Sequence, residues 1–239
     1  MKNKVVKRHI VGMIPARSGS KGIKNKNLRF VGGKPLILHT IEAAKESRRL
    51  SRVLFSTDSR EMRDLALQNG IEAPFLRPDE FARDTTCMTD VMTHCVTWLQ
   101  DHDAYHTDFL VTLYPTTPFR TGAQIDDAID CFLRSGMDCL VSVSRQKHHP
   151  YWSLKIDSRG KLQHYFGKEK LFYRRQDMPE TFEQNGAIYI VPADKIGLLD
   201  IRSMTDKTLA YVMDDRSSIN IDDELDLILA EALAGQSGS

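Results

Sequence analysis

Short apolar runs alternate along the chain with segments in which apolar side chains recur at helical spacing. The runs are bounded by glycine, proline or polar residues, as buried strands usually are. The periodic segments predict amphipathic helices, for example through Val91, Cys95, Trp98 and Leu99. Strands are predicted at residues 9–15, 52–58, 109–114, 139–144, 187–191 and 209–213. Helices are predicted after Pro35, in the segment that ends at Gly70, and around residues 91–99, 125–133 and 225–232.

This alternation predicts an α/β fold with a doubly wound, mostly parallel sheet and helices on both faces. Residues 148–183 break the rhythm, because they contain many aromatic and charged residues, a turn signal at Ser158-Arg159-Gly160 and no clear helix. We expect a small inserted hairpin or extension there. The predicted domain covers residues 1–234, and residues 235–239 are expected to form a flexible tail.

The composition fits this fold. The chain has 239 residues, 41% of them apolar, and a formal net charge of +1, which argues against a disordered, collagen-like or coiled-coil protein. No apolar run approaches the roughly 20 residues of a membrane span, and the stretch from Ile10 to Ile14 is too short for an export signal. The four cysteines lack C-x-x-C spacing and are expected to be reduced and mostly buried. A cytoplasmic protein without a membrane partner is therefore expected.

The near-zero net charge conceals an asymmetry. The first 41 residues contain ten lysines and arginines and no acid. A segment of this kind could bind nucleic acid or a small polyanion. Phe30 is its single Phe, Tyr or Trp, and glycines are interleaved with its basic residues. The sequence therefore favours a small anionic ligand, and no nucleic-acid partner is expected.

The glycine-rich loop after the first predicted strand is the main candidate for phosphate binding. Between Pro15 and Asn27, small residues let backbone N–H groups approach an anion, while Arg17, Lys21 and Lys26 supply positive charge. The loop matches neither G-x-x-x-x-G-K-[ST] nor G-x-G-x-x-G, which disfavours a P-loop ATPase or a dinucleotide enzyme. A solvated basic loop is the alternative, but the position directly after a buried strand favours a phosphate cradle.

An acidic segment near the other end of the chain is a candidate for metal binding. Residues 214–226 contain six acids and one arginine, and Mg²⁺ prefers one or two carboxylates together with phosphate oxygens. Asp222 is the favoured ligand, whereas Asp223 and Glu224 could instead stabilise the start of the last helix. The sequence predicts that this segment and the basic loop converge on a metal-bound triphosphate.

Six blocks follow one another along the chain: MIPARSGSKGIKNKN at 13–27, STD at 56–58, FLRP at 75–78, YPTTPFRT at 114–121, NGAIYI at 185–190 and SINID at 218–222. In this order they resemble the signature blocks of the acylneuraminate cytidylyltransferases, the CMP-sialic acid synthetases. Related enzymes that act on legionaminic and pseudaminic acids share these blocks. The resemblance runs from about residue 10 to 234 and implies a Rossmann-like nucleotidyltransferase fold.

The resemblance implies an enzyme that transfers CMP from CTP to the anomeric hydroxyl of a nine-carbon 2-keto sugar acid and releases pyrophosphate. It implies catalytic roles for Arg17, Lys21 and Asp222, and a Mg²⁺ site at Asp222 and Asn220. The nucleotide would contact Ala16, Arg17, Ser20, Lys21, Gly22, Lys26, Asn27, Arg77, Thr86 and Met88. The sugar acid would contact Tyr114, Thr116, Thr117, Arg175, Asn185 and Tyr189. The insertion would mediate a homodimer and reach the neighbouring active site.

Four residues depart from the pattern of that family. Asn220 stands where a second metal-binding Asp is usual, so Mg²⁺ binding should weaken. Met88 replaces a hydroxyl residue that commonly helps to read cytosine, while Tyr114 and Glu183 replace a Gln and an Arg on the sugar side. These departures leave open another nucleotide or a sugar 1-phosphate as substrate. They also leave open a nucleotide-sugar binding protein with an impaired metal site.

Overall fold

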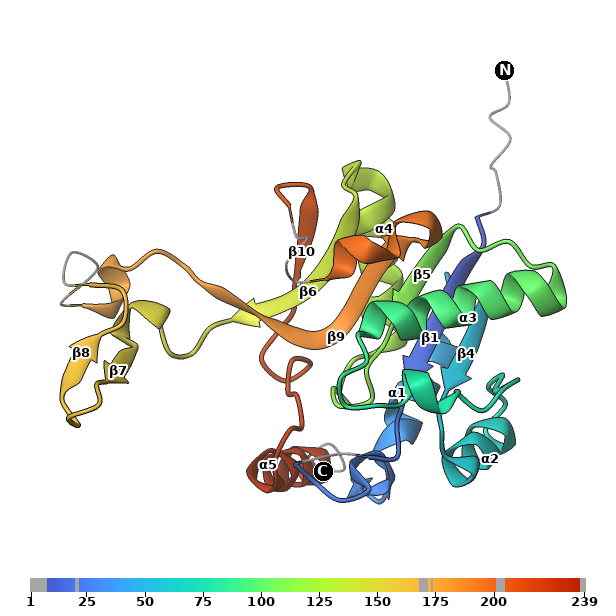
Figure 1. Ribbon diagram of the computed structural model, residues 1–239, viewed down its shortest axis with the longest axis horizontal. Helices are drawn as coiled ribbons and strands as arrows, with labels where there is room; N and C mark the ends of the chain where they lie inside the picture. Colours follow the sequence, from blue (N-terminus) through green and yellow to red (C-terminus); the bar gives the residue numbers. More distant parts are fainter. Residues whose placement is uncertain (1–7, 20–21, 168–171, 173, 201–204, 237–239) are drawn as a thin grey trace.

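A mixed sheet forms the centre of the protein. The computed structural model describes residues 8–19, 22–167, 172, 174–200 and 205–236 (Figure 1). The sheet comprises β1 (Ile10–Pro15), β4 (Arg52–Ser56), β5 (Phe109–Thr112), β6 (Cys139–Arg145), β9 (Phe182–Pro192) and β10 (Thr208–Val212), in the order β10-β6-β9-β5-β1-β4. The β1–β4, β1–β5 and β10–β6 pairs are parallel, and β9 is antiparallel to both β5 and β6. The predicted mostly parallel α/β sheet is confirmed.

Helices cover both faces of this sheet. The α-helices of the described residues are α1 (Leu36–Glu46), α2 (Arg60–Gln68), α3 (Met88–Asp103), α4 (Gly122–Ser135) and α5 (Glu224–Gly235). Because side chains alternate along a strand, Ile10 and Ile14 of β1 join a core formed with α1, α2 and α4, while Val11 and Met13 join a core formed with α3. The doubly wound arrangement is therefore present. None of the described helices has the length and apolarity to cross a membrane.

Short elements and caps complete the frame. Capping boxes begin α4, with Thr121 and Gln124, and α5, with Asp223 and Asp226, so Asp223 does cap the last helix. A two-stranded sheet joins β2 (Phe30–Val31) to β3 (Lys34–Pro35). The 3-10 helices of the described residues are η1 (Lys26–Leu28), η2 (Asp79–Phe81), η3 (Pro150–Trp152), η5 (Arg175–Asp177) and η6 (Ala193–Leu199).

The predicted insertion contains a hairpin that projects from the body of the protein (Figure 1). Its strands, β7 (Leu154–Ile156) and β8 (Leu162–His164), pair antiparallel. Several of its large apolar side chains are exposed: Trp152, Leu154, Ile156, Leu162, Tyr165 and Phe166. A two-stranded hairpin has too small a core to bury such side chains by itself.

The four cysteines are free thiols, as expected from their spacing. The expectation that they are mostly buried is correct only for Cys95 and Cys139, because Cys131 is half-buried and Cys87 is exposed. Cys87 is exposed because it forms the N-cap of α3, in a connecting segment rather than on an apolar helical face.

Candidate active site

The glycine-rich loop continues directly from β1 and is fixed by partners in other segments. The backbone N–H of Ala16 donates to the carbonyl of Ser56 at 3.0 Å. Asp58 accepts from Ser18 twice, from the backbone N–H at 2.8 Å and from Oγ at 2.6 Å. The buried amide of Asn27 donates to the carbonyl of Arg17 at 3.1 Å. These bonds hold the start of the loop at the carboxyl end of β1, where ligands bind in open α/β sheets.

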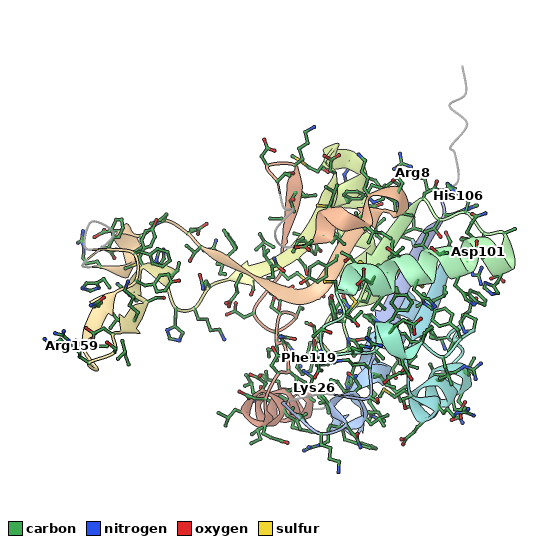
Figure 2. All side chains as sticks on the ribbon, viewed as in Figure 1. Arg8, Lys26, Asp101, His106, Phe119 and Arg159 are labelled. Carbon is green, nitrogen blue, oxygen red and sulfur yellow. The ribbon has the colours of Figure 1, made fainter. Side chains whose placement is uncertain are left out.

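The loop meets the acidic segment from the other end of the sequence. Lys26 Nζ donates to the Ile221 carbonyl at 2.7 Å and to Asp222 Oδ1 at 3.1 Å. A Cβ added to Gly22 would lie 2.3 Å from the Asp222 carbonyl oxygen. In Figure 2 Lys26 is labelled beside α5, which begins two residues after Asp222. The predicted convergence of basic loop and acidic segment is present for Gly22, Lys26 and Asp222.

A small apolar cluster explains this convergence. It buries Ile23, Val31 and Leu36 from the N-terminal part of the chain against Ile221, Leu227 and Ala230 from the C-terminal part. Burial of apolar surface therefore brings the two segments together. The charged groups Lys26 and Asp222, which adjoin this cluster in sequence, are brought together with them. The Asp222 side chain remains 70% exposed, so its carboxylate is open to a ligand.

Arg17 pairs with an acid outside the acidic segment with which the basic loop was predicted to converge. Its Nη1 pairs with Asp84, in the segment between η2 and α3, and the two side chains are 33% and 45% exposed. That segment also contains Thr86, whose hydroxyl donates to the Glu80 carbonyl at 2.8 Å, and it leads into Met88, the first residue of α3. Ser20 and Lys21 lie outside the described residues.

Arg77 is buried beside Ser56, at the carboxyl end of β4. Its Nε donates to Ser56 Oγ at 3.0 Å, and its Nη2 donates to the Ser56 carbonyl. Burial lowers the pKa of Arg77 to about 10, against the opposing effect of the Asp58 carboxylate. Arg77 thus stays charged at neutral pH and adds positive potential beneath the loop.

Two tyrosines face each other on the sugar side predicted from sequence. The rings of Tyr114 and Tyr189 meet edge to face, with centroids 5.5 Å apart and planes at 83°. Burial raises the pKa of Tyr114, and it raises the pKa of Tyr189 to about 12. Both phenols are therefore neutral at physiological pH and can donate or accept hydrogen bonds.

The loop after Tyr114 joins neighbouring elements through hydrogen bonds. The buried Thr117 hydroxyl donates to the Asn185 carbonyl at 3.2 Å. The Thr116 carbonyl accepts from the Ile221 N–H at 2.8 Å. Thr116 and Thr117 therefore connect the loop after Tyr114 both to β9 and to the acidic segment.

Asn185 lies inside the protein rather than on an open surface. Its Oδ1 accepts from Ser142 Oγ at 2.6 Å and from the Ala187 N–H at 3.1 Å, and its Nδ2 donates to Ser218 Oγ at 2.9 Å. Only 3% of Asn185 is exposed. Its side-chain amide connects β6, β9 and the acidic segment, so Asn185 links these elements inside the protein.

A cavity of about 350 Å³ lies beside the predicted metal residues. Asn220 Nδ2 donates to Asp222 Oδ2 at 2.5 Å, and both residues line the cavity together with Asn185, Glu183 and Lys147. Glu183 therefore lies where a ligand could meet it. Arg175 begins η5 in the insertion, and its side chain is outside the part that the structure describes.

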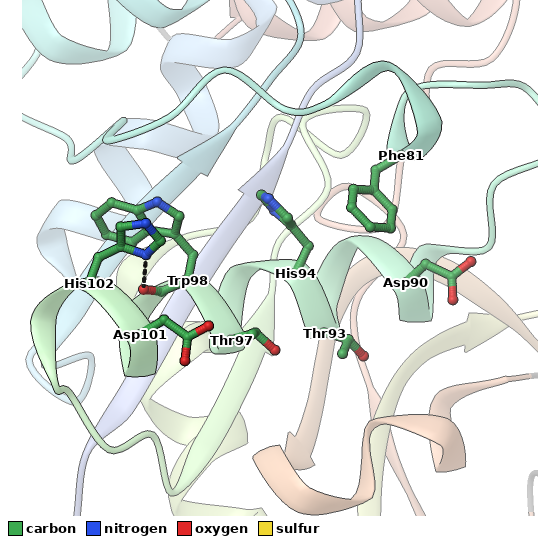
Figure 3. Close-up of a pocket in the computed structure, with 8 residues that line it drawn as sticks. All are labelled: Phe81, Asp90, Thr93, His94, Thr97, Trp98, Asp101 and His102. Carbon is green, nitrogen blue, oxygen red and sulfur yellow. Dashed lines mark hydrogen bonds between the residues drawn. The ribbon is translucent and has the colours of Figure 1, made fainter.

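Two of the further cavities lie away from Asn220 and Asp222. Figure 3 shows one of about 370 Å³ along the outer face of α3, lined by Phe81, Asp90, Thr93, His94, Thr97, Trp98, Asp101 and His102. A larger one, of about 790 Å³, includes Arg8, Tyr105 and Lys195. Neither is lined by any residue predicted from the sequence blocks, so the predicted residues favour the cavity beside Asn220 and Asp222.

Comparison with known proteins identifies the family. The family model described as Cytidylyltransferase matches residues 11–232. The chain belongs to the cytidylyltransferase family. It is 35% identical to the CMP-N,N'-diacetyllegionaminic acid synthase of Legionella pneumophila, over 94% of this chain and 95% of that protein. It is 34% identical to the N-acylneuraminate cytidylyltransferase of Escherichia coli O18:K1:H7, over 92% of this chain but 51% of that protein, so it spans about half of that relative.

A solved structure agrees with the fold of this cytidylyltransferase. CMP:2-keto-3-deoxy-manno-octonic acid synthetase complexed with CTP superposes with a TM-score of 0.70 at 16% identity, covering 96% of this chain and 99% of that one. At this identity the likeness concerns the fold. The family resemblance predicted from the six blocks is confirmed.

The sequence blocks left three residues of this cytidylyltransferase site without a role. Asp58 lies in the STD block and Arg120 in the YPTTPFRT block, so their positions were marked but not their partners. Asp84 lies outside the blocks, 67 residues from the arginine it pairs with. The available signal for Asp84 was its negative charge, which is opposite to that of the basic loop. It lies in the segment that leads to Met88, a residue predicted to contact the nucleotide.

Proposed function

We propose that this cytidylyltransferase transfers CMP from CTP to a nonulosonic acid, a sialic-acid-like sugar acid, and releases pyrophosphate. The relatives named for legionaminic and acylneuraminic acids support this substrate class. The observation that carries the proposal is the contact of Lys26 and Gly22 with Asp222. It places a cationic glycine-rich loop and an exposed carboxylate together, as a metal-bound triphosphate requires.

The nucleotide would bind over β1 and β4. Arg17, Lys21 and Lys26 would neutralise the triphosphate, with Ser20, Gly22 and the Ala16 backbone close to it and Asn27 supporting the loop. Arg77, Thr86 and Met88 would lie on the nucleoside side. Because Asp84 holds Arg17 in the structure, phosphate oxygens would replace that carboxylate when CTP binds.

Mg²⁺ would bind at Asp222 and Asn220. The exposed Asp222 carboxylate and the adjacent amide offer two oxygen donors once the Asn220 amide turns its oxygen toward the site. This set fits an ion that takes its remaining ligands from phosphate oxygens and water. When bound, the ion would neutralise charge that develops on the α-phosphate and the leaving pyrophosphate.

The sugar acid would bind over β5 and β9. Tyr114, Thr116, Thr117 and Tyr189 supply hydroxyl, carbonyl and aromatic groups there, Asn185 fixes their frame, and Arg175 is close in sequence to β9. The anomeric oxygen would attack the α-phosphorus as the bond to pyrophosphate breaks. Positioning and charge neutralisation would supply most of the rate enhancement.

The insertion supports a homodimer. Ile156 is 70% exposed and Leu162 is 66% exposed, on a hairpin that projects from the body, and contiguous exposed apolar surface marks an interface. Ile156→Lys should shift the protein toward monomer in light scattering, whereas Val212→Lys, at another exposed apolar position, should not. The use of CTP and the four free thiols support a cytoplasmic location.

The test is a matrix of nucleotides and sugar acids with pyrophosphate release as the readout. CTP, Mg²⁺ and a nonulosonic acid should give sugar-dependent pyrophosphate, and Asp222→Ala should abolish it while Asp206→Ala does not. Release with a purine nucleotide instead of CTP, or only with a sugar 1-phosphate, would favour the alternative hypothesis that Met88 and Tyr114 motivate. In that hypothesis the enzyme is a nucleotidyltransferase with a different nucleotide or sugar substrate. No turnover with any pair would refute the proposal.

A further inference from the structure

Arg120 has a role that the sequence blocks leave unassigned. It is 3% exposed and lies at the end of the loop that follows β5. Its Nη1 donates to the Ala187 carbonyl at 2.6 Å, and its Nη2 donates to Thr40 Oγ1 at 2.7 Å. Both nitrogens also approach the Tyr114 carbonyl at 3.3 Å. One planar guanidinium thus joins α1, β9 and the β5 loop.

This arginine is buried without a carboxylate partner among the described ion pairs. Its Nε has no hydrogen-bond partner among the described residues. Burial lowers the pKa of Arg120 to about 9, so it stays charged at neutral pH. A buried, carboxylate-free cation is costly for stability. Its several hydrogen bonds to separate segments form a link that an apolar side chain could not make.

Two of the groups that Arg120 holds belong to the segments that carry the tyrosine pair. Tyr114 accepts through its own carbonyl, and Ala187, whose carbonyl also accepts, is two residues before Tyr189 in β9. The two rings are 5.5 Å apart. The hydrogen bonds of Arg120 therefore fix the distance between the segments that carry both rings. Lysine could not do the same, because its ammonium lacks the rigid fork of a guanidinium.

We propose that Arg120 is a positioning residue for the sugar acid: by tying the Tyr114 carbonyl to β9 and α1, it sets the spacing of Tyr114 and Tyr189 and thereby acceptor selectivity. The proposal rests on the function proposed above. It concerns the half of the site over β5 and β9, so the nucleotide half over β1 and β4 should be spared.

Arg120→Lys and Thr40→Val test this. Each keeps a side chain of similar reach or shape but removes part of the hydrogen-bonded link, and Thr40→Val leaves Arg120 in place. We expect kcat/KM for the sugar acid to fall about tenfold, since small displacements of reacting groups are costly, while KM for CTP changes by less than about twofold. The ratio of kcat/KM for two acceptor acids of different size should also change.

Arg52→Lys is the matched control. Arg52 donates from a similar fork to Glu72 and Asp103 at the start of β4, at the opposite edge of the sheet. Arg52→Lys should lower Tm without changing the KM for CTP, the KM for the sugar acid or the ratio of kcat/KM for the two acceptor acids.

Two outcomes for Arg120→Lys and Thr40→Val would overturn the proposal. One is a lower Tm with wild-type kinetics for the sugar acid, and the other is a KM for CTP that rises as much as the KM for the sugar acid. If Arg120→Lys fails to fold, Thr40→Val decides. An inactive wild type would instead refute the proposed function.

Discussion

Gly22 gives the sharpest test of the contact between the basic loop and the acidic segment. Its added Cβ in Gly22→Ala would lie 2.3 Å from the backbone oxygen of Asp222. Ordinary contact begins at 3.4 Å, so the two segments must separate by about 1.1 Å. The obstacle is backbone, so no side-chain rotation can relieve it. The loop and the proposed metal ligand would therefore move apart.

The size of the expected effect follows from this displacement. A misplacement of about 1 Å can cost about 10²-fold in rate, and overpacking costs about 1–3 kcal/mol of stability. We expect kcat/KM for CTP to fall about 100-fold in Gly22→Ala. Gly19→Ala is the matched control, because a Cβ there meets no heavy atom of the described residues within 4 Å, and it should keep activity within about threefold of the wild type.

Sugar-dependent pyrophosphate release, measured over a range of CTP concentrations, and Tm by calorimetry would check both variants. Wild-type kcat/KM in Gly22→Ala would show that the close approach of loop and Asp222 is dispensable. An equal loss in Gly19→Ala would assign the effect to flexibility of the loop rather than to the contact. Either result would refute the reasoning.

Three further predictions follow from neighbouring contacts. Asp84→Asn should release Arg17 and lower the Kd for CTP by up to about fivefold, since a partly exposed ion pair contributes at most about 1 kcal/mol; weaker binding in calorimetry would contradict this. Asn220→Asp should lower the Mg²⁺ concentration for half-maximal activity, and an unchanged requirement would argue against a metal ligand there. Burial lowers the pKa of His39 below 6.5, so its contribution to stability is present above pH 6.5 and lost as pH falls. His39→Gln should therefore flatten the decline of Tm between about pH 6.5 and 5, and an identical slope would contradict the assignment.

Local patterns were enough to predict most strands and helices. All six residues of β1 are buried, so a short apolar run that follows polar residues and ends at Pro15 was sufficient evidence for it. The prediction for β9 was too short, since 187–191 omits its first five residues. Most of residues 182–186 are exposed, and they become a strand by pairing with β6, far away in the sequence. Such pairing leaves no signal in local hydrophobicity.

The same limit applies to the candidate site. Residue types in the loop and acidic segment predicted which chemistry belongs there, and the apolar cluster around Ile23 and Ile221 brings the two together. The partner of Arg17 could not be predicted, because a flexible charged side chain takes its partner from whatever segment the fold places nearby. Asn185 was assigned to the sugar from its block, and the three hydrogen bonds of its side-chain amide all end within the protein.

The backbone of Ile221 connects the two halves of the site. Its N–H donates to the Thr116 carbonyl on the proposed sugar side at 2.8 Å, and its carbonyl accepts from Lys26 on the proposed phosphate side at 2.7 Å. Its side chain is fully buried in the cluster that joins the chain ends. The next residue is Asp222, so the proposed metal ligand takes its position from both halves at once. Two reactants held on one rigid frame avoid much of the entropic cost of meeting, and the backbone of a single buried residue would provide that frame in the proposed reaction.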